Sequence, residues 1–177
     1  MPVPTPDETT ERIRAVALRR FCEVGYGSTN VDDIAAAAGV GVATIYRRWA
    51  DKSALANDIY SAALVSMGEV MAMPLVSTTK KQRFLELWRA TWSWAKEHPD
   101  EFTFVETHIN DAFLSPENRA AKASADEGAL ALLDDFGLTA SFDLCQSVIL
   151  GTTGMLIRKD VEIDVDAVGE RLWATLR

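Results

Sequence analysis

The chain has few of the residues from which metal centres, disulfide frameworks and many active sites are built. Its 177 residues include only two cysteines and two histidines. A disulfide framework or a zinc cluster needs more cysteines at motif spacing, so we interpret Cys22 and Cys145 as small core residues in a reducing cytosol. The sequence also has no glycine-rich phosphate loop, nucleophile elbow, Cys-x-x-Cys or His-Glu-x-x-His. It therefore predicts neither an enzyme nor a bound cofactor or metal.

Long apolar runs are missing as well. A membrane helix needs about 20 apolar residues, and the longest candidate, residues 148–157, is too short and contains two glycines and two threonines. The N-terminal stretch MPVPTPDETTERIR has no apolar core of a signal peptide. With 48% hydrophobic and 25% charged residues, the composition is that of an ordinary globular protein. We therefore expect a cytoplasmic protein without a membrane partner.

A strong positive charge, the usual mark of a nucleic-acid-binding protein, is also absent. The net charge is −8. Residues 1–53 are neutral, with seven basic and seven acidic residues, so the remainder, with eleven basic and nineteen acidic residues, carries all of the −8. This asymmetry separates a neutral head from an acidic body, and by itself it is only weak support for DNA binding.

Helical periodicity dominates what the sequence does contain. Apolar residues recur three and four positions apart, as in Ile13, Val16, Ala17, Phe21 and Val24, and no segment shows the alternation of a strand. Residues 1–7 hold three prolines without periodicity and predict a disordered arm. The fold class is therefore all-α with about nine helices. We expect them over residues 8–24, 31–38, 41–49, 52–73, 80–98, 99–113, 117–136, 142–158 and 165–176.

The segment NVDDIAAAAGVGVATIYRRWADK, residues 30–52, has the requirements of a helix-turn-helix. Two short helices must cross closely at a tight turn, which glycine accommodates best. Ala35 is small enough for the crossing and Gly39 suits the turn. The inward apolar residues are Ile34, Val40 and Ile45. The outward face of the second helix then presents Val42, Ala43, Thr44, Tyr46, Arg47 and Arg48. Short side chains, a hydroxyl and an arginine pair suit a DNA major groove.

Residues 8–60 resemble the head of the TetR family of regulators. The resemblance is carried by Gly25-Tyr26-Gly27, Thr29, residues 31–35, Ala38-Gly39-Val40, residues 43–49 and Lys52. It implies a three-helix head over residues 8–53, with the helix-turn-helix at 31–50, and a ligand-binding and dimerisation body over 54–177. It further implies that Thr29, Tyr46 and Lys52 hold phosphates and that Val42, Ala43, Thr44 and Arg48 meet base edges. Many relatives have a serine where this chain has Gly41.

The same residues have an alternative interpretation that involves no DNA. Outside this motif, Arg47 and Arg48 would be interpreted as solvated surface charges and Tyr46 as a core tyrosine. Within it, the resemblance and the outward pattern favour DNA contact. The resemblance also implies that Trp49 packs the head against the body.

The body is rich in aromatic residues, which can wall a ligand pocket or fill a plain core. Our pocket candidates are Trp88, Trp92, Phe102 and Phe104, and a plain core is the alternative for each. Trp94 lies off the main stripe, so it belongs to a pocket on a second face or to the surface. Glu106 and His108 stand two residues apart and point in different directions on a helix, which makes them a poor joint metal site.

A stripe of apolar and small residues on the helix predicted over 142–158 is our candidate dimer interface. It contains Leu144, Val148, Gly151, Thr152 and Met155, and a helix that is apolar on most sides is either central core or part of an interface. The resemblance implies a homodimer that presents two recognition helices to palindromic operator DNA and a small-molecule effector, apolar or aromatic, that releases it. The resulting hypothesis is a repressor. The alternative is a helical binding scaffold whose helix-turn-helix is purely structural.

Overall fold

The computed structural model describes residues 6–108 and 112–177, and every regular element within these ranges is a helix. The helices are α1 (Pro6–Val24), α2 (Val31–Ala38), α3 (Val42–Tyr46), α4 (Lys52–Met71), α5 (Lys80–Glu97), α6 (Pro99–Thr107), α7 (Pro116–Phe136), α8 (Phe142–Arg158) and α9 (Val165–Leu176). The all-α fold predicted from the sequence is confirmed. None of these helices combines the length and the apolar character needed to span a membrane.

The start of α1 and the end of α6 differ from the sequence-based prediction, as does the end of α3. The first helix begins at Pro6, inside the stretch expected to be a disordered arm. Proline is favourable in the first turn of a helix, and Asp7 and Glu8 place negative charge at its positive end. The helix expected to continue to residue 113 ends at Thr107. His108 leaves the helical conformation there and packs its ring against Phe104 and Phe113.

Local capping explains why most of the other boundaries could be predicted. Five helices begin with a side-chain oxygen that accepts a hydrogen bond from the amide three residues ahead. The capping residues are Asp51, Thr79, Ser115, Ser141 and Asp164. At the other end, Gly39 and Gly137 close α2 and α7 with left-handed backbone, at φ of 64° and 70°. Each of these signals acts within one turn of the chain, so each can be seen in the sequence.

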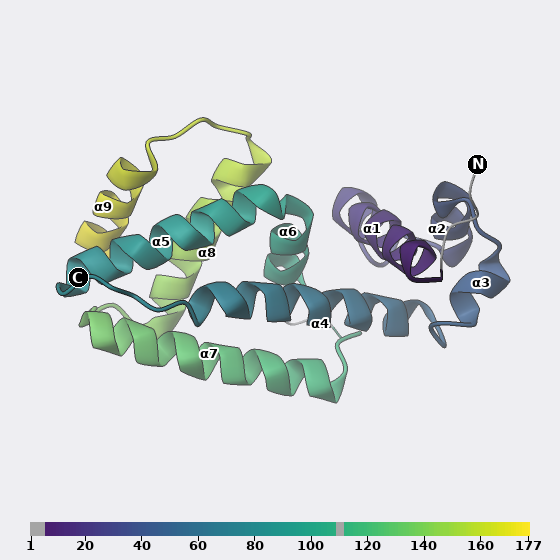
Figure 1. Cartoon of the computed structure of the whole chain (residues 1–177), viewed down its shortest axis with the longest axis horizontal. Coiled ribbons are helices and arrows are strands. Elements are labelled where there is room, and N and C mark those ends of the chain that lie inside the picture. The colour runs from purple at the N-terminus through teal and green to yellow at the C-terminus, as the bar shows by residue number, and fades with distance from the viewer. Residues whose placement is uncertain (1–5, 109–111) are drawn as a thin grey trace.

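Helix α4 is the axis along which the rest of the chain is arranged (Figure 1). At 20 residues it is about 30 Å long. Its first turns adjoin α3, with α1 and α2 close by, and its later turns lie beside α7 and α5. Helices α8 and α9 complete the body, and α6 lies between the two ends of the molecule, in contact with α1, α4 and α8.

The apolar core is continuous from the head into the body. One cluster joins α1, α2 and α3 to the first half of α4, and it also includes Phe104 and Val105 of α6. A second cluster in the body is built around Phe84, Trp88 and Trp173. Because α4 and α6 contribute to the first cluster and also contact other body helices, the head packs on a surface that the body supplies.

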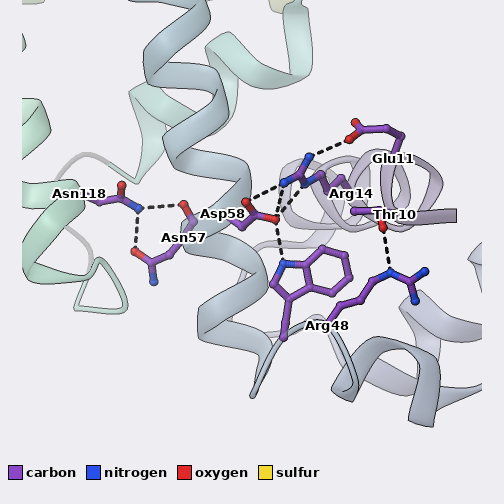
Figure 2. Close-up of polar contacts among 8 residues, drawn as sticks. Thr10, Glu11, Arg14, Arg48, Asn57, Asp58 and Asn118 are labelled. Atoms are coloured by element: carbon purple, nitrogen blue, oxygen red, sulfur yellow. Dashed lines mark hydrogen bonds and ion pairs between the residues drawn. The ribbon is translucent and has the colours of Figure 1, made fainter. Parts of the chain in front are cut away.

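Polar contacts of two consecutive α4 residues reinforce this connection (Figure 2). The Asp58 carboxylate accepts hydrogen bonds from Arg14 at 2.9 and 2.7 Å and from the Trp49 indole at 2.8 Å. On the other side, the Asn57 side chain accepts from the Ser115 amide at 2.7 Å and from the Asn118 side chain at 2.9 Å. One turn of α4 therefore holds the head through Asp58 and the start of α7 through Asn57.

A close approach of α6 to α8 depends on Gly154. A Cβ atom at this position would overlap the Glu106 carboxylate. With glycine there, Glu106 passes over α8 and accepts a hydrogen bond from Arg158 at 3.0 Å. This ion pair is partly exposed, so its main consequence is the position of α6 against α8.

We predict that Asp58→Asn weakens the folded state by about 1–3 kcal/mol, because the variant loses the ion pair with Arg14 and one strong acceptor. The measurement is the free energy of unfolding from urea denaturation followed by circular dichroism. The control is Glu69→Gln, which removes the charge of an exposed acid on the same helix and should change stability by less than about 0.5 kcal/mol. Equal stability of the two variants would show that Asp58 does not hold the head.

Candidate nucleic-acid interface and internal cavity

The turn between α2 and α3 is fixed by Gly39. Its left-handed backbone lets the Gly39 amide donate to the carbonyl of Ala36 at 3.2 Å and the Val40 amide donate to the carbonyl of Ala35 at 3.0 Å. This pair of bonds satisfies the last carbonyls of α2 and sends the chain directly into α3. Ile34, Ala35 and Ile45 are buried beneath the turn, as the sequence indicates.

Helix α3 is shorter than predicted, but its winding continues. The helix spans Val42–Tyr46 instead of reaching residue 49. The amides of Arg47 and Trp49 still donate to carbonyls four residues back, at 3.1 and 3.0 Å, while Arg48 bonds three residues back at 2.9 Å. This tighter last turn places Trp49 inward, where it is 7% exposed and reaches Asp58.

The outward face of α3 carries the residues expected to meet DNA. Tyr46 is 51% exposed, and Ala43 and Arg47 are also exposed. Val42 and Thr44 are half-buried beside them. The face therefore offers short side chains next to a phenol and a guanidinium, which is a surface that can approach base edges and phosphates.

Arg48 is directed across the head rather than straight outward (Figure 2). Its Nε donates to the Thr10 hydroxyl of α1 at 2.8 Å, and one Nη donates to the Thr44 carbonyl at 3.3 Å. The guanidinium is thus oriented by α1 and α3 together. An arginine oriented in this way loses less conformational freedom when it makes a further contact.

Thr29 and Lys52, two of the predicted phosphate contacts, bond within the head. The Thr29 side chain is 1% exposed, and its hydroxyl donates to the Gly25 carbonyl at 2.9 Å. Lys52 donates to the carbonyls of Tyr26 and Thr29 at 2.7 and 2.8 Å, and its ammonium lies 4.3 Å from the Tyr26 ring centroid. Both residues hold the loop between α1 and α2 against the start of α4.

Two helix starts in the head have no side-chain cap. Asn30 and Gly41 stand at the N-cap positions of α2 and α3, and neither makes a side-chain capping bond. The backbone amides at the start of α3 therefore have no capping partner from Gly41. At a helix N-terminus, free amides can donate hydrogen bonds to an anionic oxygen, such as that of a phosphate.

A cavity of about 450 Å³ lies in the body between α4, α5, α7 and α8. Its walls are almost entirely apolar, and the polar side chains among its lining residues are those of Thr91, Asp126 and Gln146. This volume and composition are typical of a site for a small organic molecule.

The four aromatic residues predicted for the pocket occupy different places. Trp88 lines the cavity, whereas Trp92 is buried nearby without lining it. Phe102 packs behind Trp94, with ring centroids 6.4 Å apart, and Phe104 belongs to the core that joins head and body. Trp94, which the sequence left between pocket and surface, lines the cavity and donates to the Ser66 hydroxyl at 2.8 Å.

Other lining residues were not identified from the sequence. They include the aromatic rings of Phe84, Phe136 and Phe142 and the α4 side chains of Leu64, Met67 and Met71. Phe84 belongs to the helical stripe that the sequence shows, so its burial could be predicted. Which stripe residues face the cavity depends on how four helices pack, and no local pattern contains that information.

The stripe proposed for a dimer interface is accessible along α8. Leu144 and Met155 are 51% and 45% exposed. Val148, Gly151 and Thr152 are half-buried. A Cβ atom built on Gly151 would meet nothing within 4 Å. The stripe is thus a largely apolar, accessible surface with open space over Gly151.

Glu106 and His108 point apart, as their spacing predicts. Glu106 pairs with Arg158, and His108 is 7% exposed between Phe104 and Phe113. Within residues 6–108 and 112–177, no three His, Cys, Asp or Glu side chains come together as a metal site. Cys22 is held in the junction of α1 and α6, where burial raises the pKa of its thiol to about 12.

Comparisons with known proteins agree with this geometry. Residues 13–59 match the model of a family described as bacterial regulatory proteins, tetR family. A segment of 63 residues is 41% identical to the HTH-type transcriptional regulator AcrR of Shigella flexneri; it spans 36% of this chain and 29% of that regulator.

Solved structures resemble the whole chain. A TetR family transcriptional regulator from Thermus thermophilus, PfmR, has a TM-score of 0.73 and 24% identity, over 99% of this chain and 97% of that one. A tetR-family regulatory protein from Rhodococcus has a TM-score of 0.75 and 17% identity, over 96% of both chains. At these identities the likeness concerns the fold.

We predict that Gly39→Ala destabilises the protein by about 1–2 kcal/mol, because a side chain at a φ of 64° is strained. Gly39→Asn should cost less, since asparagine tolerates this conformation better. Gly27→Ala is the control, because no strain is expected there and the added atom would meet nothing within 4 Å. Urea denaturation of the three variants measures the effect. If Gly39→Ala unfolds at the same urea concentration as Gly27→Ala, the turn does not depend on glycine.

Proposed function

Because this chain belongs to the TetR family of bacterial regulatory proteins, we propose that it is a sequence-specific DNA-binding regulator of transcription. In this proposal it acts as a homodimer on a palindromic operator, and a small molecule in the body cavity releases it. The regulation is repression. The observation that carries the proposal is the outward face of α3, held at a fixed angle by the Gly39 turn.

The proposed contacts divide into two groups. Val42, Ala43, Thr44 and Arg48 face base edges, while Tyr46 and Arg47 hold phosphates beside them. The hydrogen bond from Arg48 to the Thr10 hydroxyl orients the Arg48 guanidinium for this role. Thr29 and Lys52 act indirectly, because they hold the loop before α2 in place. Backbone amides of the head can then donate hydrogen bonds to phosphates of the DNA backbone.

Helix α4 provides a physical route from the cavity to DNA. Several residues of its second half, including Leu64, Met67 and Met71, line the cavity, and its first half is part of the head core. A ligand that prefers one position of α4 would therefore also prefer one position of the head. It can shift DNA affinity only by the difference between its affinities for the two states, and such coupling is typically about 1–3 kcal/mol.

We predict that the protein selects a palindromic motif from a pool of random duplexes and that Tyr46→Ala binds this motif at least tenfold more weakly. Loss of the phenol removes a phosphate contact from the exposed end of α3. The measurement is selection with sequencing, followed by titration of the selected duplex at fixed salt. Arg171→Ala, an exposed change on α9, should bind normally. A folded protein that enriches no motif would instead support the helical scaffold.

We predict that Gly151→Arg converts the dimer to monomers, because it places a long charged side chain at the open centre of the α8 stripe. The monomer itself should keep its stability, since nothing lies within 4 Å of a Cβ atom at this position. Sedimentation velocity measures the change. Ala121→Arg, at an exposed position of α7, is the control and should remain dimeric. A Gly151→Arg protein that still sediments as a dimer would place the interface elsewhere.

A further inference from the structure

The wall of the body cavity carries very little charge. Along α5 the lining extends from Phe84 to Trp94, ten residues or about 15 Å of helix. Among the lining residues that the structure describes, Asp126 of α7 alone is charged, and the other polar side chains are those of Thr91 and Gln146. The charge that a ligand meets in the cavity therefore depends on how Asp126 is paired.

Both oxygens of the Asp126 carboxylate are already engaged. One forms an ion pair with the Lys122 ammonium, and the other accepts a hydrogen bond from the Gln146 side-chain amide at 3.2 Å. Lys122 precedes Asp126 by one turn of α7, and its side chain is only 16% exposed. Of these two charges, only that of Asp126 belongs to the cavity lining. The acid therefore faces the cavity, and the base that balances it lies behind.

This arrangement disfavours ligand ions of either sign. A carboxylate would leave water for apolar walls and would meet a like charge there. An ammonium could pair with Asp126 only by displacing Lys122, which would leave that cation with no partner and with little access to water. A hydroxyl meets neither penalty, and it can donate to a remaining lone pair of the Asp126 carboxylate.

Two glycines leave part of the cavity open. Gly68 of α4 and Gly128 of α7 line it, and a Cβ atom built on either would meet nothing within 4 Å. Both glycines lie inside long helices, where glycine is less favourable than alanine. Because packing does not require their small size, their presence is explained by the room that they leave for a bound molecule.

We propose that the cavity selects uncharged, largely apolar molecules and that the pair of Asp126 and Lys122 sets this selectivity, with Asp126 as the residue that excludes carboxylates. The apolar walls account for the affinity, and the balanced pair accounts for the preference against ions. The role of such a molecule as the effector rests on the function proposed above, whereas its binding does not.

Three probes that share a ten-carbon chain measure the selectivity: 1-decanol, decanoate and decylammonium. Each is titrated at neutral pH into the full chain without DNA, below the concentration at which it forms micelles. Calorimetry and the fluorescence of Trp88 and Trp94, which line the cavity, report binding. We expect 1-decanol to bind at least tenfold more tightly than either ion. Equal or tighter binding of an ion, or no binding of 1-decanol, would overturn the proposal.

Asp126→Asn and Lys122→Gln should shift the selectivity in opposite directions. Asp126→Asn leaves Lys122 as the charge nearest the cavity and should strengthen decanoate binding at least fivefold. Lys122→Gln leaves Asp126 unpaired and should strengthen decylammonium binding at least fivefold. Neither change should alter 1-decanol binding by more than about twofold. The two variants are independent, so the test stands if one of them fails to fold.

Glu127→Gln is the matched control for these variants. It removes the charge of the exposed acid next to Asp126 and should bind all three probes as the parent does. If no folded variant of the pair gains affinity for its ion, or if Glu127→Gln gains as much affinity for decanoate as Asp126→Asn, the pair does not set the selectivity.

Gly68→Leu tests whether 1-decanol occupies this cavity. The added side chain should weaken 1-decanol binding at least fivefold without lowering the melting temperature, because leucine favours a helix and the space is open. Val65→Leu, at a position of the same helix that is 63% exposed, is the control and should bind normally. Unchanged 1-decanol binding by Gly68→Leu would place the molecule elsewhere and overturn the proposal.

A separate titration on the selected operator distinguishes the ligand class from the proposed function. Binding of 1-decanol without any change in DNA affinity would support the ligand class and contradict the effector role. Release of DNA by decanoate or decylammonium, with no binding of 1-decanol, would support the effector role and overturn the ligand class.

Discussion

A single carboxylate orients the head on the apolar core that joins it to the body. Asp58 accepts hydrogen bonds from Arg14 of α1 and from Trp49 at the end of the α3 turn, so both sides of the head are bound to one residue of α4. The neighbouring Asn57 points to the other side and bonds the start of α7. Adjacent residues on a helix point about 100° apart. One turn of α4 can therefore hold the head and the body at once, and the angle between them is set by how α4 lies.

Much of this architecture follows from local signals in the sequence. The acids and hydroxyls before α4, α7, α8 and α9 cap the following turn, and Gly39 and Gly137 end helices with a backbone that other residues resist. Such signals span four or five residues, which is why most helix ends lie where the sequence predicts them. The end of α6 does not, because its position depends on the packing of His108 against Phe113, a contact that helical periodicity does not reveal.

The same distinction separates the two candidate sites. The helix-turn-helix is a continuous segment, so its outward and inward residues could be assigned from spacing alone. The cavity is built from four helices, and its lining depends on their packing. An aromatic stripe identified Trp88 but could not distinguish it from Phe102, which supports Trp94 from behind. The phosphate contacts that the resemblance implies for Thr29 and Lys52 stay a prediction. The hydrogen bonds of both residues to carbonyls of the head could not be predicted, because only the fold brings these groups together.

Helix α4 links these two levels of organisation. Its first half belongs to the core that joins head and body, where Tyr60 packs against Phe104, and residues of its second half line the cavity. A ligand that fits the cavity better in one arrangement of α4 would stabilise that arrangement over any other. The difference between the two is the differential affinity that a switch requires, and α4 would carry it to the Asp58 carboxylate that holds the head.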